Sequence, residues 1–176
     1  MRIRVATASL GLFGLLLVPS LSAQDGGVEL GIDAGFTISI PDEGDNLTSL
    51  SVPLQRLRAG FFLSDAMALE PAIAFNVLSG GGSTLTTISA SASLLYHLST
   101  DPTASRIYVR GGAGIVYIDA DGSASQFGIE GGLGVKTAGE PIFLRFEGVF
   151  GYNFENDDFQ SSIDIGALAG ISVVTG

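Results

Sequence analysis

The sequence predicts an all-β fold, an eight-stranded antiparallel up-and-down barrel, and three observations lead to this prediction. Apolar and polar residues alternate with period two along eight segments, the pattern of strands whose two faces meet different surroundings. Residues typical of turns separate these segments. The chain of 176 residues is 46% hydrophobic and 15% charged. Its internal segments nevertheless contain no run near the ~20 apolar residues of a membrane-spanning helix.

The N-terminus has the three parts of a secretory signal peptide. A basic start is followed by a short apolar stretch at 10–18 and by small residues that predict cleavage after Ala23. The apolar stretch is short for an anchor helix. We therefore expect residues 1–23 to be removed and residues 24–176 to form one exported barrel domain. The sequence contains no Cys, so we expect neither disulfides nor thiol chemistry.

Four strands are predicted in the first half of this domain, at residues 28–40, 54–63, 67–77 and 87–98. VELGIDAGFTISI sorts apolar residues from Glu, Gly, Asp, Thr and Ser in a way that no helix would produce. LQRLRAGFFL opposes apolar residues to two arginines, and MALEPAIAFNV opposes them to Glu and Asn. TISASASLLYHL opposes them to serines and His97. Pro71 has no backbone N–H to donate to a neighbouring strand, so we expect a bulge or a strand end at that residue.

Four more strands are predicted in the second half, at residues 107–117, 126–137, 143–152 and 162–173. IYVRGGAGIVY and QFGIEGGLGVKT oppose apolar residues to glycines and a few long charged side chains. FLRFEGVFGY sets Arg145 and Glu147 among large apolar residues, and the last segment opposes Ile, Ala and Val to Ser, Asp and Gly. The eight segments are long enough for the ~9–11 residues that cross a bilayer at a tilt.

The connections between these segments alternate between two kinds. Three are tight, at residues 64–66, 100–105 and 138–141. The other four, which contain most of the acidic connection residues, are at 41–51, 79–83, 119–123 and 155–159. Short periplasmic turns and longer outer loops are the asymmetry of an outer-membrane barrel. If the domain starts in the periplasm, the acidic set faces outside.

Residue size indicates which face of the strands is inside. The polar face is rich in Gly, Ser and Ala, as the narrow interior of an eight-stranded barrel requires. The other face is bulky and apolar, and Tyr96, Tyr117, Tyr152 and Phe154 near the strand ends suit a membrane interface. This distribution favours a transmembrane barrel over the alternative, a soluble lipocalin-like carrier with its apolar face inside.

The segments SASLLYHL, RIYVRGGAGIVYI, FGIEGGLGVK and FLRFEGVFGYNF resemble the small outer-membrane β-barrel proteins of the OmpA, OmpX and opacity type. The resemblance covers the domain after the leader and is specific for architecture. It implies a monomer in the outer membrane whose partners are outer-membrane lipid and the outer-membrane assembly machinery. Many members end on an aromatic residue, whereas this sequence ends on Gly176, which leaves its assembly signal open.

The polar face predicts a group of charged side chains inside the barrel. These residues are Glu29, Asp33, Arg56, Arg58, Glu70, Arg110, Glu130, Lys136, Arg145, Glu147 and Asp164. Charges in a confined interior are costly unless they are paired and hydrogen-bonded, so we expect an ion-pair network with ordered water. The network either only fills the barrel or rearranges to pass small ions, as in a small ion-conducting pore.

Other chemistries find little support in the sequence. His97 and Ser99 have the spacing used by some outer-membrane lipid-modifying enzymes. His97, however, lies at the predicted periplasmic end and faces the lumen, whereas such an enzyme acts at the outer leaflet. DADGS at 119–123 has its glycine too early for a calcium loop, and GLGVKT lies within a strand and therefore cannot be a phosphate loop. We expect no catalytic residue, no cofactor and no metal site.

The charge balance points away from nucleic acid as a partner. Loss of Arg2 and Arg4 with the leader changes the formal net charge from −10 to −12, which repels a polyanion. We therefore expect an integral outer-membrane barrel with a structural or surface-interaction role. Its acidic loops would face any extracellular partner.

Overall fold

The computed structural model describes residues 27–42, 49–80, 83–99, 101, 104–119, 123–137, 139 and 141–175. The predicted leader, residues 1–23, lies outside the described residues, so its cleavage stays a prediction. Parts of the predicted acidic connections, at 43–48, 81–82 and 120–122, lie outside them too. No helix among the described residues is long and apolar enough to cross a membrane.

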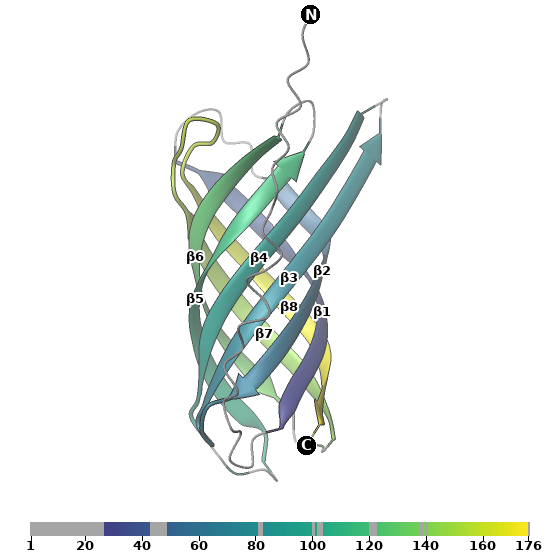
Figure 1. Ribbon diagram of the computed structural model, residues 1–176, viewed down its shortest axis with the longest axis vertical. Coiled ribbons are helices and arrows are strands. Elements are labelled where there is room, and N and C mark those ends of the chain that lie inside the picture. The colour runs from purple at the N-terminus through teal and green to yellow at the C-terminus, as the bar shows by residue number, and fades with distance from the viewer. Residues whose placement is uncertain are drawn as a thin grey trace, which may run out of the picture.

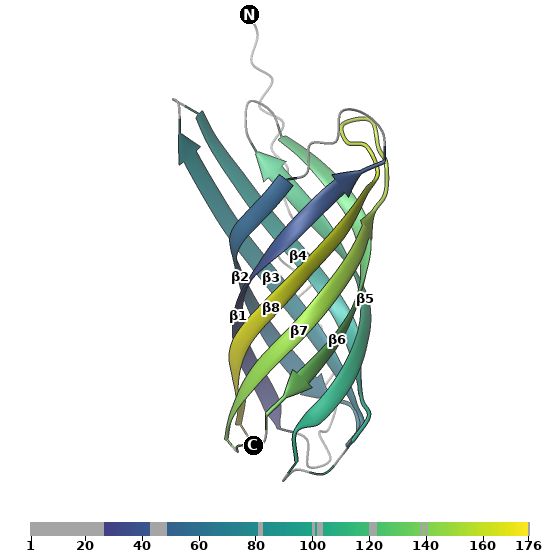
Figure 2. The ribbon, with the colours of Figure 1, turned by 180° about the vertical axis from the view of Figure 1, so that it is seen from behind.

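Eight strands form one closed barrel, which confirms the predicted fold class. Each strand pairs antiparallel with the next along the chain, and β1 closes the ring against β8 (Figures 1 and 2). The strands are β1 Val28–Pro41, β2 Ser49–Phe62, β3 Met67–Gly80, β4 Ser83–His97, β5 Arg106–Asp119, β6 Ser123–Lys136, β7 Ile142–Asn153 and β8 Ser162–Thr175.

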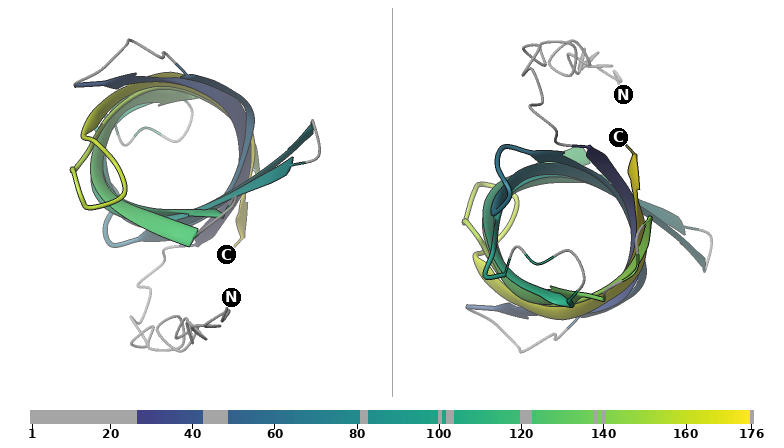
Figure 3. Two further views of the ribbon diagram at one scale, coloured as in Figure 1. Left: turned by 90° about the horizontal axis from the view of Figure 1, so that it is seen from above. Right: turned by 90° about the horizontal axis from the view of Figure 1, so that it is seen from below.

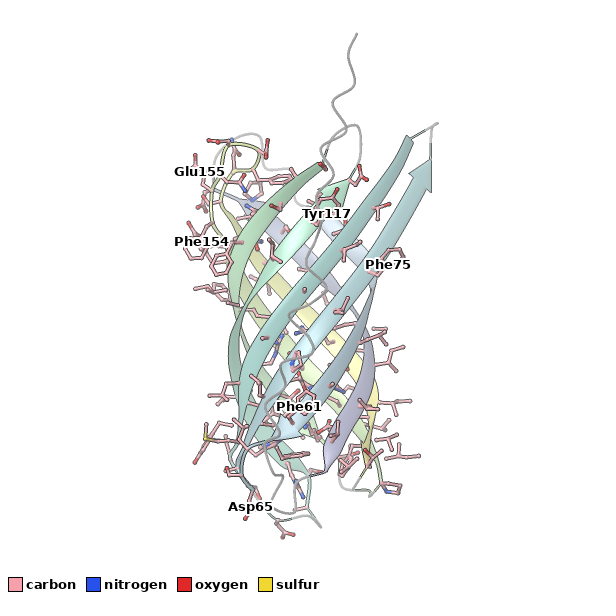
Figure 4. All side chains as sticks on the ribbon, in the orientation of Figure 1. Phe61, Asp65, Phe75, Tyr117, Phe154 and Glu155 are labelled. Atoms are coloured by element: carbon pink, nitrogen blue, oxygen red, sulfur yellow. The ribbon has the colours of Figure 1, made fainter. Side chains whose placement is uncertain are left out.

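The two ends of the barrel differ. We call the end that holds the β2–β3, β4–β5 and β6–β7 connections the lower end, and the opposite end the upper end (Figure 1). Asp65 lies at the lower end and Glu155 at the upper end (Figure 4). The tight and the acidic connections therefore lie at opposite ends of the molecule, as up-and-down topology requires.

Several strands continue past the apolar segments that predicted them. The β3–β4 ladder extends to Gly80↔Ser83, so most of the predicted 79–83 loop belongs to the hairpin itself. Backbone pairing does not require apolar side chains, and Ser, Thr and Gly continue it beyond the alternating segment. Beyond Phe75 the described part of β3 pairs only with β4, and the upper ends of these two strands project away from the barrel wall (Figure 3).

Pro71 is accommodated inside β3 by a gap in the ladder, not by a bulge or a strand end. The β2–β3 pairing runs from Gln55↔Phe75 to Arg58↔Ala72 and resumes at Phe61↔Leu69 in the same register. On the other side Pro71 pairs with Ala92 of β4. The missing N–H of proline thus coincides with an interruption on the β2 side only.

The barrel is apolar outside and charged inside. Outward side chains are large and exposed, as Leu57 at 60% and Leu133 at 59% illustrate. Inward charges are buried, and Glu29 and Arg58 are only 3% and 4% exposed. Side chains project outward all along the wall, among them Phe75 and Phe154 (Figure 4). This distribution is the reverse of that in a soluble ligand-carrying barrel.

Candidate functional site

The lumenal charges are placed by strand alternation, because inward positions recur at every second residue. Ten of the eleven predicted lumenal charges form ion pairs with one another, and Asp164 is the exception. The eleven residues, Asp164 included, come from seven of the eight strands. The paired residues are Glu29, Asp33, Arg56, Arg58, Glu70, Arg110, Glu130, Lys136, Arg145 and Glu147.

Most of these pairs join into one chain of alternating charge. Its order is Asp33, Arg58, Glu70, Arg145, Glu147, Arg110, Glu130 and Arg56. The Arg58–Asp33 contact measures 3.1 Å and the Arg56–Glu130 contact 2.9 Å. The weakest link is Arg58 Nη1 to Glu70 Oε2 at 3.9 Å. Because the chain links β2 to β6 and β3 to β7, it spans the lumen.

Arg145 is at the centre of the chain. Its two terminal nitrogens donate to both carboxylate oxygens of Glu70, a bidentate contact of the kind that fixes geometry as well as charge. The same guanidinium donates to Glu147, two residues further along β7. The side chains of all three residues are 0–3% exposed. The charges in FLRFEGVFGY are therefore buried and compensated inside the barrel.

Lys136 and Glu29 form a separate pair. The Lys136 ammonium donates to Glu29 Oε2 at 2.6 Å, and both side chains are almost completely buried. Both lie near the lower ends of their strands, β6 and β1. This pair crosses the lumen at the lower end.

Tyr108 is part of the network, although it was not predicted from the sequence. Its side chain is fully buried, its hydroxyl donates to Glu147 Oε2 at 2.6 Å, and the Arg145 guanidinium lies 4.7 Å from its ring centre. The alternation of the strand could have indicated its inward position, because Tyr108 lies two residues before Arg110 and therefore on the same face. Gly134 lies directly across from Tyr108, and a Cβ there would collide with the ring.

Apolar side chains complete the filling of the lower lumen. Leu95 and Ala68 form a buried cluster with Tyr108, against which Phe62 packs. Phe143 is also buried, at 5% exposure. We call the ion-pair chain, the Lys136–Glu29 pair and these apolar side chains the plug. Together they fill the lower half of the barrel.

His97 lies in this lower region and is 2% exposed. Its ring contacts the rings of Phe62 and Tyr108, at centroid distances of 6.2 and 5.9 Å. Neither ring nitrogen has a hydrogen-bond partner among the described residues. Ser99 lies past the end of β4, and its hydroxyl accepts from the backbone N–H of Asp101. His97 therefore lies inside the lower lumen, whereas Ser99 lies beyond the end of the strand.

The upper half of the lumen is hollow. A cavity of about 230 Å³ lies between strands of the upper half, and we call it the cup. Its lower boundary includes Arg56 and Glu130 of the plug, and small or hydroxyl-bearing side chains make up much of its wall. Polar lining residues besides Arg56 and Glu130 are Thr37, Ser39, Thr87, Ser89, Ser91, Asn153 and Asp164.

Asp164 belongs to the cup and not to the plug. Its Oδ1 accepts a hydrogen bond from Ser39, and its Oδ2 accepts one from Asn153 at 2.8 Å. Both donors are neutral, so the carboxylate is held in place without a countercharge. Within the described residues no group of three or more His, Cys, Asp or Glu side chains could hold a metal ion.

No protein-family model matches the sequence, and no curated protein sequence is similar to it.

Solved structures, in contrast, have the same fold. Neisserial surface protein A superposes with a TM-score of 0.67 at 16% identity, over 85% of this chain and 97% of that chain. A major outer membrane protein from Thermus thermophilus gives 0.56 at 12% identity, over 84% and 99%. The attachment invasion locus protein of Yersinia pestis gives 0.51 at 12% identity, over 85% and 99%. At these identities the likeness extends to the fold, the small eight-stranded barrel, as the sequence resemblance suggested.

Proposed function

We propose that this chain is an integral outer-membrane β-barrel, exported and monomeric, with a structural or surface-interaction role. The observation that supports the proposal is the inverted polarity of the barrel, with exposed Leu, Ile and Phe outside and buried ion pairs inside. A closed barrel pairs its backbone hydrogen-bonding groups between neighbouring strands, so it is one of the two structures able to span hydrocarbon. Outer-membrane lipid then covers the apolar wall.

Membrane insertion is tested by fractionation and by gel mobility. We expect extraction only with detergent, and a band on SDS gels that shifts on heating. The outward variant Ile129→Arg, in the middle of β6, should lose about 2–4 kcal/mol of stability, the cost of an arginine at the bilayer midplane. Leu63→Arg, in the lower connection, is the matched control and should lose much less. A freely soluble native protein would overturn the proposal.

The closed lower lumen supports a structural role. In the plug, most charged side chains contact an opposite charge and are almost fully buried, so ions have no wide path between the two ends. We expect no sustained conductance from the native barrel in planar bilayers. Arg145→Ala and Glu147→Ala remove side chains at the centre of the plug, so their conductance is the comparison for a less tightly closed lumen. Steady conductance by the native barrel would instead favour the alternative, a small ion-conducting pore.

A surface-interaction role rests on the acidic upper end. Glu155, Asp157 and Asp158 are exposed in the β7–β8 connection, and Asp42 and Asp119 are exposed at the ends of β1 and β5. An extracellular partner for this surface would be positively charged. Adhesion of cells that display the barrel should fall when the three β7–β8 carboxylates are neutralised. Unchanged adhesion would leave the barrel with its structural role alone.

A further inference from the structure

The cup contains the one unbalanced charge among the described residues of the lumen. Six carboxylates and five basic side chains point inward, and ten of these eleven pair with one another. Every Lys and Arg after the predicted leader lies among the described residues. The sixth, Arg106, begins β5 at the lower end, where it donates to the Asp101 carbonyl. No basic side chain of the domain is therefore left to compensate Asp164.

The surroundings of Asp164 fix its carboxylate without neutralising it. Ser39 and Asn153 each donate one hydrogen bond, and Asn153 also contacts Ser162. A carboxylate offers about four lone-pair positions, so about two remain for another donor. Asp164 is half-buried, so water screens its charge less than at an open surface. The free acceptor positions of this carboxylate can take N–H donors from a cation.

The rest of the cup selects the size and polarity of that cation. Thr37, Thr87, Ser89 and Ser91 supply hydroxyls to a wall that also contains apolar residues such as Ala74 and Val116, so a ligand with both ammonium and methylene groups fits it. At the floor, Glu130 keeps 24% of its side chain exposed, more than any other paired carboxylate of the plug. A bare metal ion would be small for about 230 Å³, and the described residues offer no metal-ligand cluster. An acyl chain would contact the apolar part of the wall but would offer no donor to the Asp164 carboxylate.

We propose that the cup binds a compact organic ammonium ion, with one ammonium group on Asp164 and the remainder of the molecule among the wall hydroxyls. The exposed carboxylates at the upper end raise the local concentration of cations at its mouth. An anion would meet the same negative field and be repelled. This binding is a property of the barrel itself and does not depend on the proposed membrane location or surface role.

The test uses the full domain, purified in detergent or nanodiscs, with putrescine as the probe. Calorimetric titration at low ionic strength should detect saturable binding by the native barrel. Asp164→Asn should weaken binding about tenfold or more, equivalent to about 1.4 kcal/mol or more. Asp119→Asn removes the same charge from an exposed residue at the upper end of β5 and should weaken binding less than about threefold. The neutral analogue 1,4-butanediol should not bind.

A second variant distinguishes binding inside the cup from non-specific attraction of cations by the acidic surface. Ala74→Leu places a larger side chain into the cup from β3 and should abolish putrescine binding while all charges remain. Heat-shifted gel mobility verifies that each variant is folded. The proposal is overturned if the native barrel does not bind putrescine or if 1,4-butanediol binds equally well. Equal weakening by Asp164→Asn and Asp119→Asn, or unchanged binding by folded Ala74→Leu, would overturn it as well.

Discussion

The plug and the cup occupy the same barrel, yet one is densely filled and the other is hollow. Strand β4 contributes to both. Its inward residues at the lower end are His97, Leu95 and Ser93, all buried, whereas Ser89 and Thr87 higher up line open space. The same eight strands alternate inward and outward residues in both halves, although the described upper part of β3 pairs only with β4. Along β4 itself, the size of the inward side chain at each height separates the filled part of the lumen from the hollow part.

The largest expected effect comes from removing the central cation of the plug. Arg145→Ala leaves Glu70 without its bidentate partner, and an uncompensated buried charge costs about 3–5 kcal/mol. Denaturant unfolding in detergent measures this loss. Arg106→Ala, at the lower end and outside the network, should change stability by about 0.5 kcal/mol or less. Equal losses in the two variants would mean that the plug does not stabilise the barrel.

A smaller effect is expected from filling space that the plug already uses. Gly134→Ala would force a Cβ against the buried ring of Tyr108, and overpacking typically costs about 1–3 kcal/mol. Gly111→Ala is the matched control, because a Cβ there would meet nothing within 4 Å. Unfolding midpoints of the two variants provide the measurement. If Gly134→Ala and Gly111→Ala had the same unfolding midpoint, the tight packing inferred for the lower lumen would be wrong.

Removing one hydroxyl from the plug should cost less again. Tyr108→Phe deletes the hydrogen bond to Glu147 Oε2, but that oxygen keeps its contacts with Arg145. We expect a loss of about 1 kcal/mol with no change in fold, measured by denaturant unfolding. Tyr117→Phe, outside the network and near the upper end, is the control. A loss as large as that of Arg145→Ala would indicate that Tyr108, and not the guanidinium, organises the network.

The smallest effect is expected in the cup. Ser89→Leu introduces a large side chain next to open space and should change stability by about 0.5 kcal/mol or less. Ser93→Leu, two inward positions lower on the same strand, would displace the groups of Arg110 and Glu130 that contact its hydroxyl. The difference in unfolding free energy between the two variants measures the contrast directly. Similar losses would remove the distinction between a filled and a hollow half.

Strands, faces and the inward charges were predictable from the sequence because alternation is local. Tyr108, Leu95 and Phe143 were not assigned to the lumen, although each lies an even number of residues from a lumenal polar residue on its own strand. The sequence could not predict which lumenal charges pair with each other. Lys136 meets Glu29 across the barrel from 107 residues away, and only the register of all the intervening strands brings them together. The cup depends on the same register, because the register decides which small residues of different strands lie at the same height along the barrel.

The long sequence separation within the plug has a consequence for assembly. Lys136–Glu29 and Arg145–Glu70 join residues 107 and 75 apart, so these contacts become possible only when distant strands have been brought together. Such contacts repay the entropy of loop closure only after distant parts of the chain have met, so they favour slow folding. Both pairs also join strands that are not neighbours in the sheet, β6 with β1 and β7 with β3. Opening the barrel at a seam between two strands would therefore have to separate buried opposite charges as well as backbone hydrogen bonds.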